Sequence, residues 1–207
     1  MTQISSLFIL DNSTIVISQC IFQDLAFQES LLIYRNYLES QNNINSSVED
    51  SFFINITSSQ KAIFDIIDIY GSFILTNSVF QNMSGLSILT MNSLYGDLYL
   101  ESIEFSHIQI SDYYVEFEKG LNASFNNITL IFSDDRNAKT FGGGAFYFSF
   151  VNYKQFKNVR IKNILSTKSV FGITIIDNAD ISEEPLTSRS VIYFIQFISF
   201  SIFFIRL

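Results

Sequence analysis

The chain has 207 residues, a formal net charge of −8, a single cysteine and a single proline. The length suits one domain or one rod of stacked units, and the 48% hydrophobic content argues against a disordered chain. The acidic charge disfavours a nucleic-acid partner, which requires a concentrated basic face, and the lone Cys20 excludes an internal disulfide framework and a cysteine-based zinc site.

The first ten residues do not resemble a signal peptide. Met1 to Leu10 carries no basic region, and its apolar part, Leu7 to Leu10, is too short for the hydrophobic core of such a segment. We therefore expect the chain to begin inside a repeat.

One short phrase then returns along the chain: an aromatic residue, any residue, a small polar residue and an aliphatic residue. Successive copies lie 20 to 36 residues apart, which is the range of solenoid repeats. The copies begin at Phe22, Phe53, Phe80, Phe105 and Phe125, with a weaker copy at Ile161.

Alternating apolar residues precede three of these copies at fixed offsets. Ile15 and Ile17 stand seven and five positions before Phe22, and equivalent pairs precede Phe80 and Phe105. Alternation indicates a strand with one buried face, and a fixed offset indicates a turn of fixed length. Further apolar runs predict a second strand in each unit: Leu31 to Tyr34, Ala62 to Ile67, Leu86 to Leu89, Tyr113 to Phe117, Ala145 to Phe148 and Val170 to Ile176.

These features predict an all-β fold, a right-handed parallel β-helix of six to seven coils over residues 1–188, in which like residues stack on like residues. The polar position of the phrase holds Asp24, Asn55, Asn82, His107, Asn127 and Asn163. Asn and Asp tolerate the left-handed backbone of a sharp corner, so this column is predicted to be a structural turn ladder. His107, the only histidine, then occupies a turn position and is not expected to be a catalytic base.

Phe80-Gln81-Asn82, Phe125-Asn126-Asn127 and Gly142-Gly143-Gly144-Ala145-Phe146 resemble the FxxN and GGA(I/L/V) signatures of polymorphic-outer-membrane-type β-helix repeats. The asparagine usually comes one place earlier here. Similar pectin-lyase-like repeats occur in large surface proteins of ciliated protists, and the resemblance covers about residues 10 to 180. It implies a fold that hosts carbohydrate lyases and hydrolases as well as adhesins and passive stalks, so the fold alone does not select a function.

The pattern breaks at residues 129–144. The polar stretch around Asp134, Asp135 and Arg136 is predicted to be a loop projecting from one coil, and such loops often carry binding sites. A plain solvated loop is the alternative. The three glycines that follow lack the lysine and helix of a phosphate-binding loop.

A carbohydrate-active enzyme on this scaffold would need carboxylates that converge between coils. The candidates are Asp65 with Asp68, Asp134 with Asp135, Glu116 with Glu118, and Glu183 with Glu184. Asp65 and Asp68 should face opposite sides of a strand, whereas Glu116 and Glu118 should share the solvent face. We expect no two of these clusters to lie at matching positions of successive coils. The sequence therefore predicts no catalytic residue, no metal site and no cofactor.

Six N-x-S/T sequons occur, of which Asn12, Asn45 and Asn122 are the more plausible glycan acceptors. Those at Asn55, Asn82 and Asn127 belong to the predicted ladder, where a stacked amide could not carry a glycan.

The tail, residues 189–207, contains a charge-free stretch over 191–205 that is just shorter than a membrane span. A short or truncated membrane anchor, a final β-helix coil or pair of cap strands, and an end that belongs to the gene model but not to the repeat family are three alternatives. Taken together, the sequence predicts a structural or adhesive segment of a larger secreted or membrane-associated protein, extracellular or at the cell surface, with carbohydrate or another surface protein as partner. A carbohydrate-active enzyme on the same fold is one alternative, and a defective or truncated repeat with no independent function is another.

Overall fold

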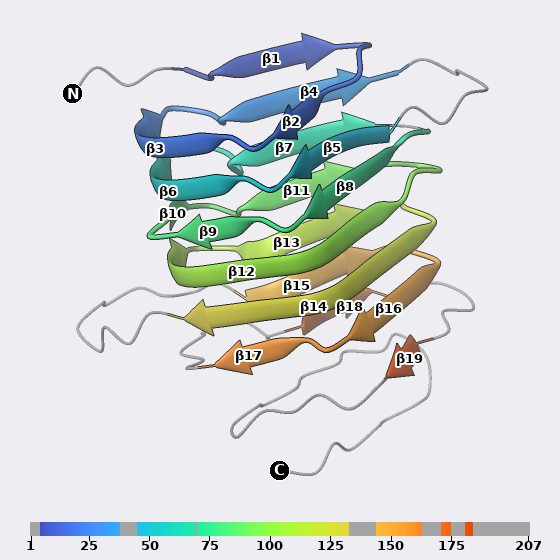
Figure 1. Ribbon diagram of the computed structural model, residues 1–207. Helices are drawn as coiled ribbons and strands as arrows, with labels where there is room; N and C mark the ends of the chain where they lie inside the picture. Colours follow the sequence, from blue (N-terminus) through green and yellow to red (C-terminus); the bar gives the residue numbers. More distant parts are fainter. Residues whose placement is uncertain are drawn as a thin grey trace.

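The protein is an all-β parallel solenoid of about five turns (Figure 1). The computed structural model describes residues 5–37, 45–68, 70–132, 144–162, 171–174 and 181–183, and no helix occurs among them. The sequence predicted six to seven coils. The column that begins at Phe22 makes five full turns, through Phe53, Phe80, Phe105 and Leu130 to Ile161.

One side of each coil belongs to a seven-stranded sheet in which every pairing is parallel. In order they are β1 (Phe8–Asp11), β4 (Leu32–Asn36), β7 (Phe64–Asp68), β11 (Leu89–Asn92), β13 (Tyr113–Glu118), β15 (Gly144–Ser149) and β18 (Phe171–Thr174). All of these strands except β1 correspond to the second strand that the sequence predicts for each unit.

The rest of each coil belongs to a twelve-stranded sheet that covers two sides of the solenoid, because each coil bends between two strand segments. In β12 and β14 the two segments form one continuous strand, whose first part pairs with one set of strands and whose second part pairs with another. The members are β2 (Val16–Ser18), β3 (Ile21–Phe27), β5 (Asn45–Glu49), β6 (Phe52–Ser58), β8 (Ser72–Thr76), β9 (Val79–Gln81), β10 (Ser84–Gly85), β12 (Leu98–Ile110), β14 (Asn122–Phe132), β16 (Tyr153–Lys157), β17 (Arg160–Lys162) and β19 (Ile181–Glu183).

The core is a stack of phenylalanines in the register that the sequence predicts. Phe22 pairs with Phe53, Phe53 with Phe80, and Phe80 with Phe105. The ring centroids are 5.2, 4.8 and 5.1 Å apart, in stacked orientations. Offset aromatic stacking adds about 0.5–1.5 kcal/mol per pair to the burial of apolar area.

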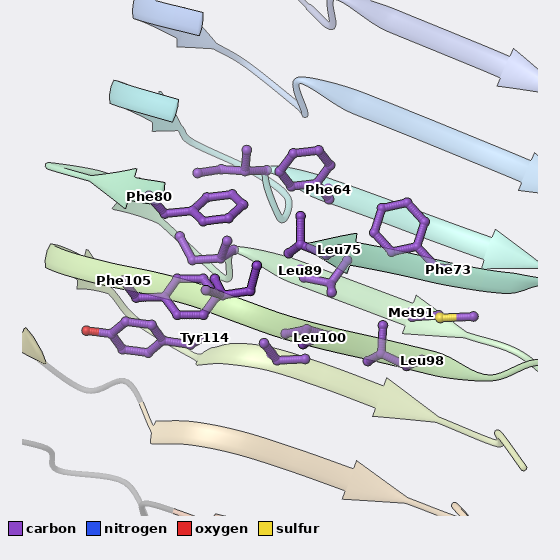
Figure 2. Packing of buried hydrophobic residues seen from close by; sticks show 14 of the residues in the cluster. Phe64, Phe73, Leu75, Phe80, Leu89, Met91, Leu98, Leu100, Phe105 and Tyr114 are labelled. Carbon is purple, nitrogen blue, oxygen red and sulfur yellow. The ribbon is translucent and has the colours of Figure 1, made fainter. Parts of the chain in front are cut away.

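The two sheets interlock through rings that meet edge to face. Phe64 of β7 meets Phe53 at 5.2 Å and Phe80 at 5.9 Å, and Tyr114 of β13 meets Phe105 at 5.7 Å. Figure 2 shows Phe80 and Phe105 on one side of this interior, with Phe64 and Tyr114 reaching toward them. The predicted inward columns therefore form one continuous core.

Buried serines support the corner before the phenylalanine strands. The Ser51 hydroxyl accepts from the Cys20 N–H at 3.1 Å, and the Ser78 hydroxyl accepts from the Ser51 N–H at 3.2 Å. Both hydroxyls also donate to a carbonyl two residues earlier. Half-buried Cys20 occupies the corresponding place in the first coil, so its thiol is part of this corner.

Candidate functional site

Four polar residues stand in one column where the phenylalanine strands turn. Asp24, Asn55, Asn82 and His107 have φ angles of 56°, 55°, 53° and 54°, all in the left-handed region, and all four side chains are exposed. Asn55 Nδ2 donates to Asp24 Oδ1 at 2.7 Å, and Asn82 Nδ2 donates to Asn55 Oδ1 at 3.2 Å. The column is thus a surface ladder of one carboxylate and two amides, with His107 at the position that asparagine holds in the two coils before it.

Asn127 does not belong to that column, and the sequence-based placement was wrong. Pairing of Glu101 with Asn126 and of Ile103 with Ile128 sets Asn127 beside Ser102, whose hydroxyl accepts from Asn127 Nδ2 at 3.2 Å. A second column of left-handed corners runs there, through Gln19, Asp50, Asn77, Ser102, Asn127 and Asn158. Each coil therefore has two left-handed corners. At both, an inward apolar residue is followed by one intervening residue and then by the polar corner residue.

Several predicted residues lie outside the described residues. These are Asn163 of the ladder, the loop residues Asp134, Asp135 and Arg136, and the tail from 189 to 207 with its apolar stretch 191–205.

The three candidate glycan acceptors occupy different settings. Asn12 is exposed at a corner, where its Oδ1 accepts from the Tyr37 N–H at 3.0 Å. Asn45 is exposed at the start of β5. Asn122 is half-buried at the start of β14, and its Nδ2, the atom that a glycan would modify, donates to Asp97 Oδ1 at 2.7 Å. Asn12 and Asn45 are therefore the more accessible of the three.

The outer face of the seven-stranded sheet brings carboxylates together. Asp65 of β7 pairs with Thr90 of β11, which pairs with Glu116 of β13. The two acidic residues therefore stand in one column, two coils apart, with the neutral Thr90 in the coil between them. Our expectation concerned successive coils, and this column does not contradict it. The number of residues per coil varies along this chain. The sequence therefore could not predict whether residues two coils apart fall in the same column.

The orientation of the predicted acidic pairs agrees with strand alternation. Asp68 is buried inside the coil at 1% exposure, whereas the side chain of Asp65 is 22% exposed on the outside. Glu116 and Glu118 share the outer face, while Val115 and Phe117 between and beside them are fully buried.

Each of these carboxylates has a neutral or cationic donor. The Thr90 hydroxyl donates to Asp65 Oδ1 at 3.3 Å, the Ser87 hydroxyl donates to Glu116, and Asn92 Nδ2 donates to Glu118 Oε2 at 3.3 Å. Lys61 Nζ lies 3.2 Å from Asp65 and 3.7 Å from Glu29. Because Lys61 is more than a third exposed, solvent screens these ion pairs and they add little to stability.

This face, defined by Asp65, Thr90, Asn92, Glu116 and Glu118 and called the acidic face below, is suited to hydrogen bonding with a hydroxyl-rich ligand. Two rungs separate the backbones of Asp65 and Glu116, which is about 10 Å at the usual strand spacing. That backbone spacing is slightly larger than the roughly 6.5–9.5 Å between the carboxyl groups of inverting glycosidases. Across the described ranges, no three His, Cys, Asp or Glu side chains gather as a metal site requires.

Lys154 and Tyr114 are buried ionisable groups that the sequence did not single out. Lys154 of β16 is fully buried, its Nζ donates to the Val151 carbonyl, and burial lowers its pKa to about 8. Tyr114 is fully buried, which raises the pKa of its hydroxyl. The signal for Lys154 was its alternation with Phe156, which places both side chains on the inner face of the strand.

Comparison with known proteins adds no relative. No protein-family model, no curated protein and no solved structure matches this chain. Among the residues that the structure describes, no helix is long and apolar enough to cross a membrane.

Proposed function

We propose that this chain is a structural or adhesive β-solenoid segment of a larger surface or secreted protein. The observation that carries the proposal is the unbroken register of the phenylalanine column and its polar corners through successive coils. Such regularity suits a rod-shaped spacer, because each added coil extends the same interior and the same outer faces.

The geometry supports the role of a spacer. Five turns at about 4.8 Å per rung give a rod of about 24 Å, held by stacked rings and continuous backbone ladders. Each coil is stabilised by its neighbours, so the rod resists bending while its loops and outer faces remain available for contacts.

The resemblance to pectin-lyase-like and polymorphic-outer-membrane-type repeats supports an extracellular or cell-surface location and a carbohydrate or another surface protein as partner. The exposed sequon at Asn12 supports passage through the secretory pathway. Under this proposal the apolar stretch 191–205 associates with a membrane. The net charge of −8 supports the absence of a nucleic-acid partner.

A carbohydrate-active enzyme is the second candidate, and the acidic face favours it. Asp65 and Glu116 share a column, so an extended polysaccharide lying along the rod would meet both carboxylates. Their differing neighbours, a lysine beside Asp65 and a hydroxyl beside Glu116, would separate the roles of base and acid.

One experiment separates the two candidates. The full chain is tested on polyuronates, β-glucans and chitin for retention in affinity gels and for release of new chain ends. The variants are Glu116→Gln and, as a matched control on another outer face, Glu101→Gln. The adhesive proposal expects retention or cell-surface binding without new chain ends.

Chain-end release that Glu116→Gln abolishes and Glu101→Gln leaves intact would establish the enzyme instead. Failure of the chain to bind any polysaccharide or intact cells, together with antibody labelling only after cells are permeabilised, would overturn the adhesive surface role.

A further inference from the structure

Four of the six sequon asparagines stand at left-handed corners of the coils. Asn12, Asn55, Asn82 and Asn127 have φ angles of 50°, 55°, 53° and 56°, and all four side chains are exposed. The sequence disfavoured the last three as glycan acceptors, because a stacked amide leaves no room for a sugar. Since these amides are exposed in the folded chain, a glycan on any of them would extend into solvent.

Asn55 and Asn82 form a matched pair, because they occupy the same corner column in successive coils. Asn55 Nδ2 donates to a carboxylate oxygen of Asp24 at 2.7 Å, whereas Asn82 Nδ2 donates to the neutral amide oxygen of Asn55 at 3.2 Å. Hydrogen bonds to a charged group are shorter and roughly twice as strong as those between neutral groups. The Asn82 amide is therefore held less firmly than the Asn55 amide.

Asn122 and Asn127 form a second matched pair on a single strand, β14. Asn122 is half-buried, and its Nδ2 donates to Asp97 Oδ1 at 2.7 Å, while exposed Asn127 donates to the neutral Ser102 hydroxyl at 3.2 Å. The backbone N–H of Asn122 bonds to the same Asp97 oxygen at 3.1 Å. The Asn122 side chain thus shares an acceptor with its own backbone at the start of β14, whereas the Asn127 amide has only the neutral bond.

N-glycosylation replaces one of the two hydrogens on the side-chain amide nitrogen. Nδ2 bonds to the anomeric carbon of an oligosaccharide carried on a lipid pyrophosphate, the bond from that carbon to the pyrophosphate breaks, and one amide proton passes to a base of the transferring enzyme. A single N–H remains, and the planar amide fixes its direction. The folded chain therefore accepts a glycan at least cost where the side chain is exposed and its hydrogen bond is weak.

We propose that Asn82 and Asn127 carry N-linked glycans and that Asn55 and Asn122 remain unmodified in the folded chain. This proposal rests on the passage through the secretory pathway that the proposed function implies. A glycan added before folding must still be accommodated afterwards, which disfavours half-buried Asn122. Asn55 lies one rung, about 4.8 Å, from Asn82 along the rod, so a second bulky glycan there would collide with the first.

The two glycans would stand on one side of the rod. Asn82 lies between β9 and β10 and Asn127 lies within β14, so both belong to the region of the twelve-stranded sheet. The acidic face lies on the seven-stranded sheet, and these glycans leave it uncovered. Contacts with a partner are thereby directed to the acidic face.

The test uses the full chain secreted from a eukaryotic host behind a cleavable leader. Each variant removes the hydroxyl residue of one sequon and keeps the corner asparagine in place. Ser84→Ala removes the sequon of Asn82, and Thr129→Val removes that of Asn127. Each should lower the mass of the secreted chain by one glycan on a gel.

The matched controls remove the other sequon of each pair in the same way. Thr57→Val acts on Asn55, and Ser124→Ala acts on Asn122. Both should leave the mass of the secreted chain unchanged, because these asparagines are expected to carry no glycan.

Peptide mass spectrometry of the secreted wild type is a second measurement that needs no variant. Glycans are released with an amidase in heavy-oxygen water, which leaves a labelled aspartate at each modified asparagine. The label should be found at Asn82 and Asn127. A secreted chain unlabelled at either position, or labelled as strongly at Asn55 or Asn122, would overturn the proposal. Because the leader is supplied, this result does not depend on where the natural protein resides, which antibody labelling of intact cells tests separately.

Discussion

The first coil and the inner coils contain the same columns but bury them to different extents. Phe22 is only half-buried, whereas Phe53, Phe80 and Phe105 in its column are 0% exposed. Phe8 and Leu10 of β1 are likewise half-buried, while the residues that follow them in their columns, Leu32 and Tyr34, are fully buried. A coil in a solenoid therefore obtains its full stabilisation only when it has a neighbour on each side.

The largest effect is expected from Phe80→Ala, which removes a ring enclosed between Phe53 and Phe105 and also touched by Phe64. The loss of burial and the cavity together should cost about 3–5 kcal/mol of unfolding free energy. Urea unfolding followed by circular dichroism measures this cost. A loss below 1 kcal/mol would show that the column does not hold the coils together.

The same truncation in the first coil, Phe22→Ala, should cost less, about 1–2 kcal/mol, since the Phe22 ring is only half-buried and, among the described residues, stacks on a phenylalanine of its column on one side only. The two variants serve as controls for each other, because chemistry and column are identical. Equal losses in the same urea series would contradict the conclusion that the first coil is incompletely packed.

Lys154 lies toward the C-terminal end of the described coils, where an inward-facing position holds an ionisable side chain. Burial lowers its pKa to about 8 from 10.5, so the unfolded chain binds the proton more tightly and stability should rise between about pH 8 and 10.5. Lys154→Met should abolish this rise and stabilise the chain at pH 7. Lys157→Met, at an exposed position of the same strand, is the control and should retain the rise.

An effect no larger than that of Phe22→Ala is expected at the exposed corners, where the side chains are not enclosed by neighbouring coils. Asn82→Ala should cost about 1–2 kcal/mol, because alanine is strained at a φ of 53°, whereas Asn82→Gly should cost less because glycine adopts that angle freely. Thermal unfolding of both variants measures the difference. A larger loss for glycine than for alanine would assign the corner's stability to the amide ladder rather than to backbone conformation.

Much of the fold could be predicted because its rules are local. The alternation before Phe22, Phe80 and Phe105 and the fixed offset to each ring predicted strands and their register, and the structure confirms both. The repeated phrase of an aromatic residue followed two places later by a polar residue misplaced Asn127. Both corners of a coil fit that phrase, and only the strand pairing shows which corner a copy occupies. The acidic face was missed for a related reason, since the phase between Asp65 and Glu116 depends on the lengths of two intervening coils.

The sequence by itself determined which residues point inward, where the chain turns and that like residues repeat, because alternation and left-handed corners are properties of a few adjacent residues. Only the tertiary structure decided which coil lies against which, and hence how deeply each side chain is buried. Half-buried Phe22, buried Lys154 and buried Asp68 all follow from those neighbours. Desolvation depends on everything that surrounds a group, and that information is spread over segments distant in the chain.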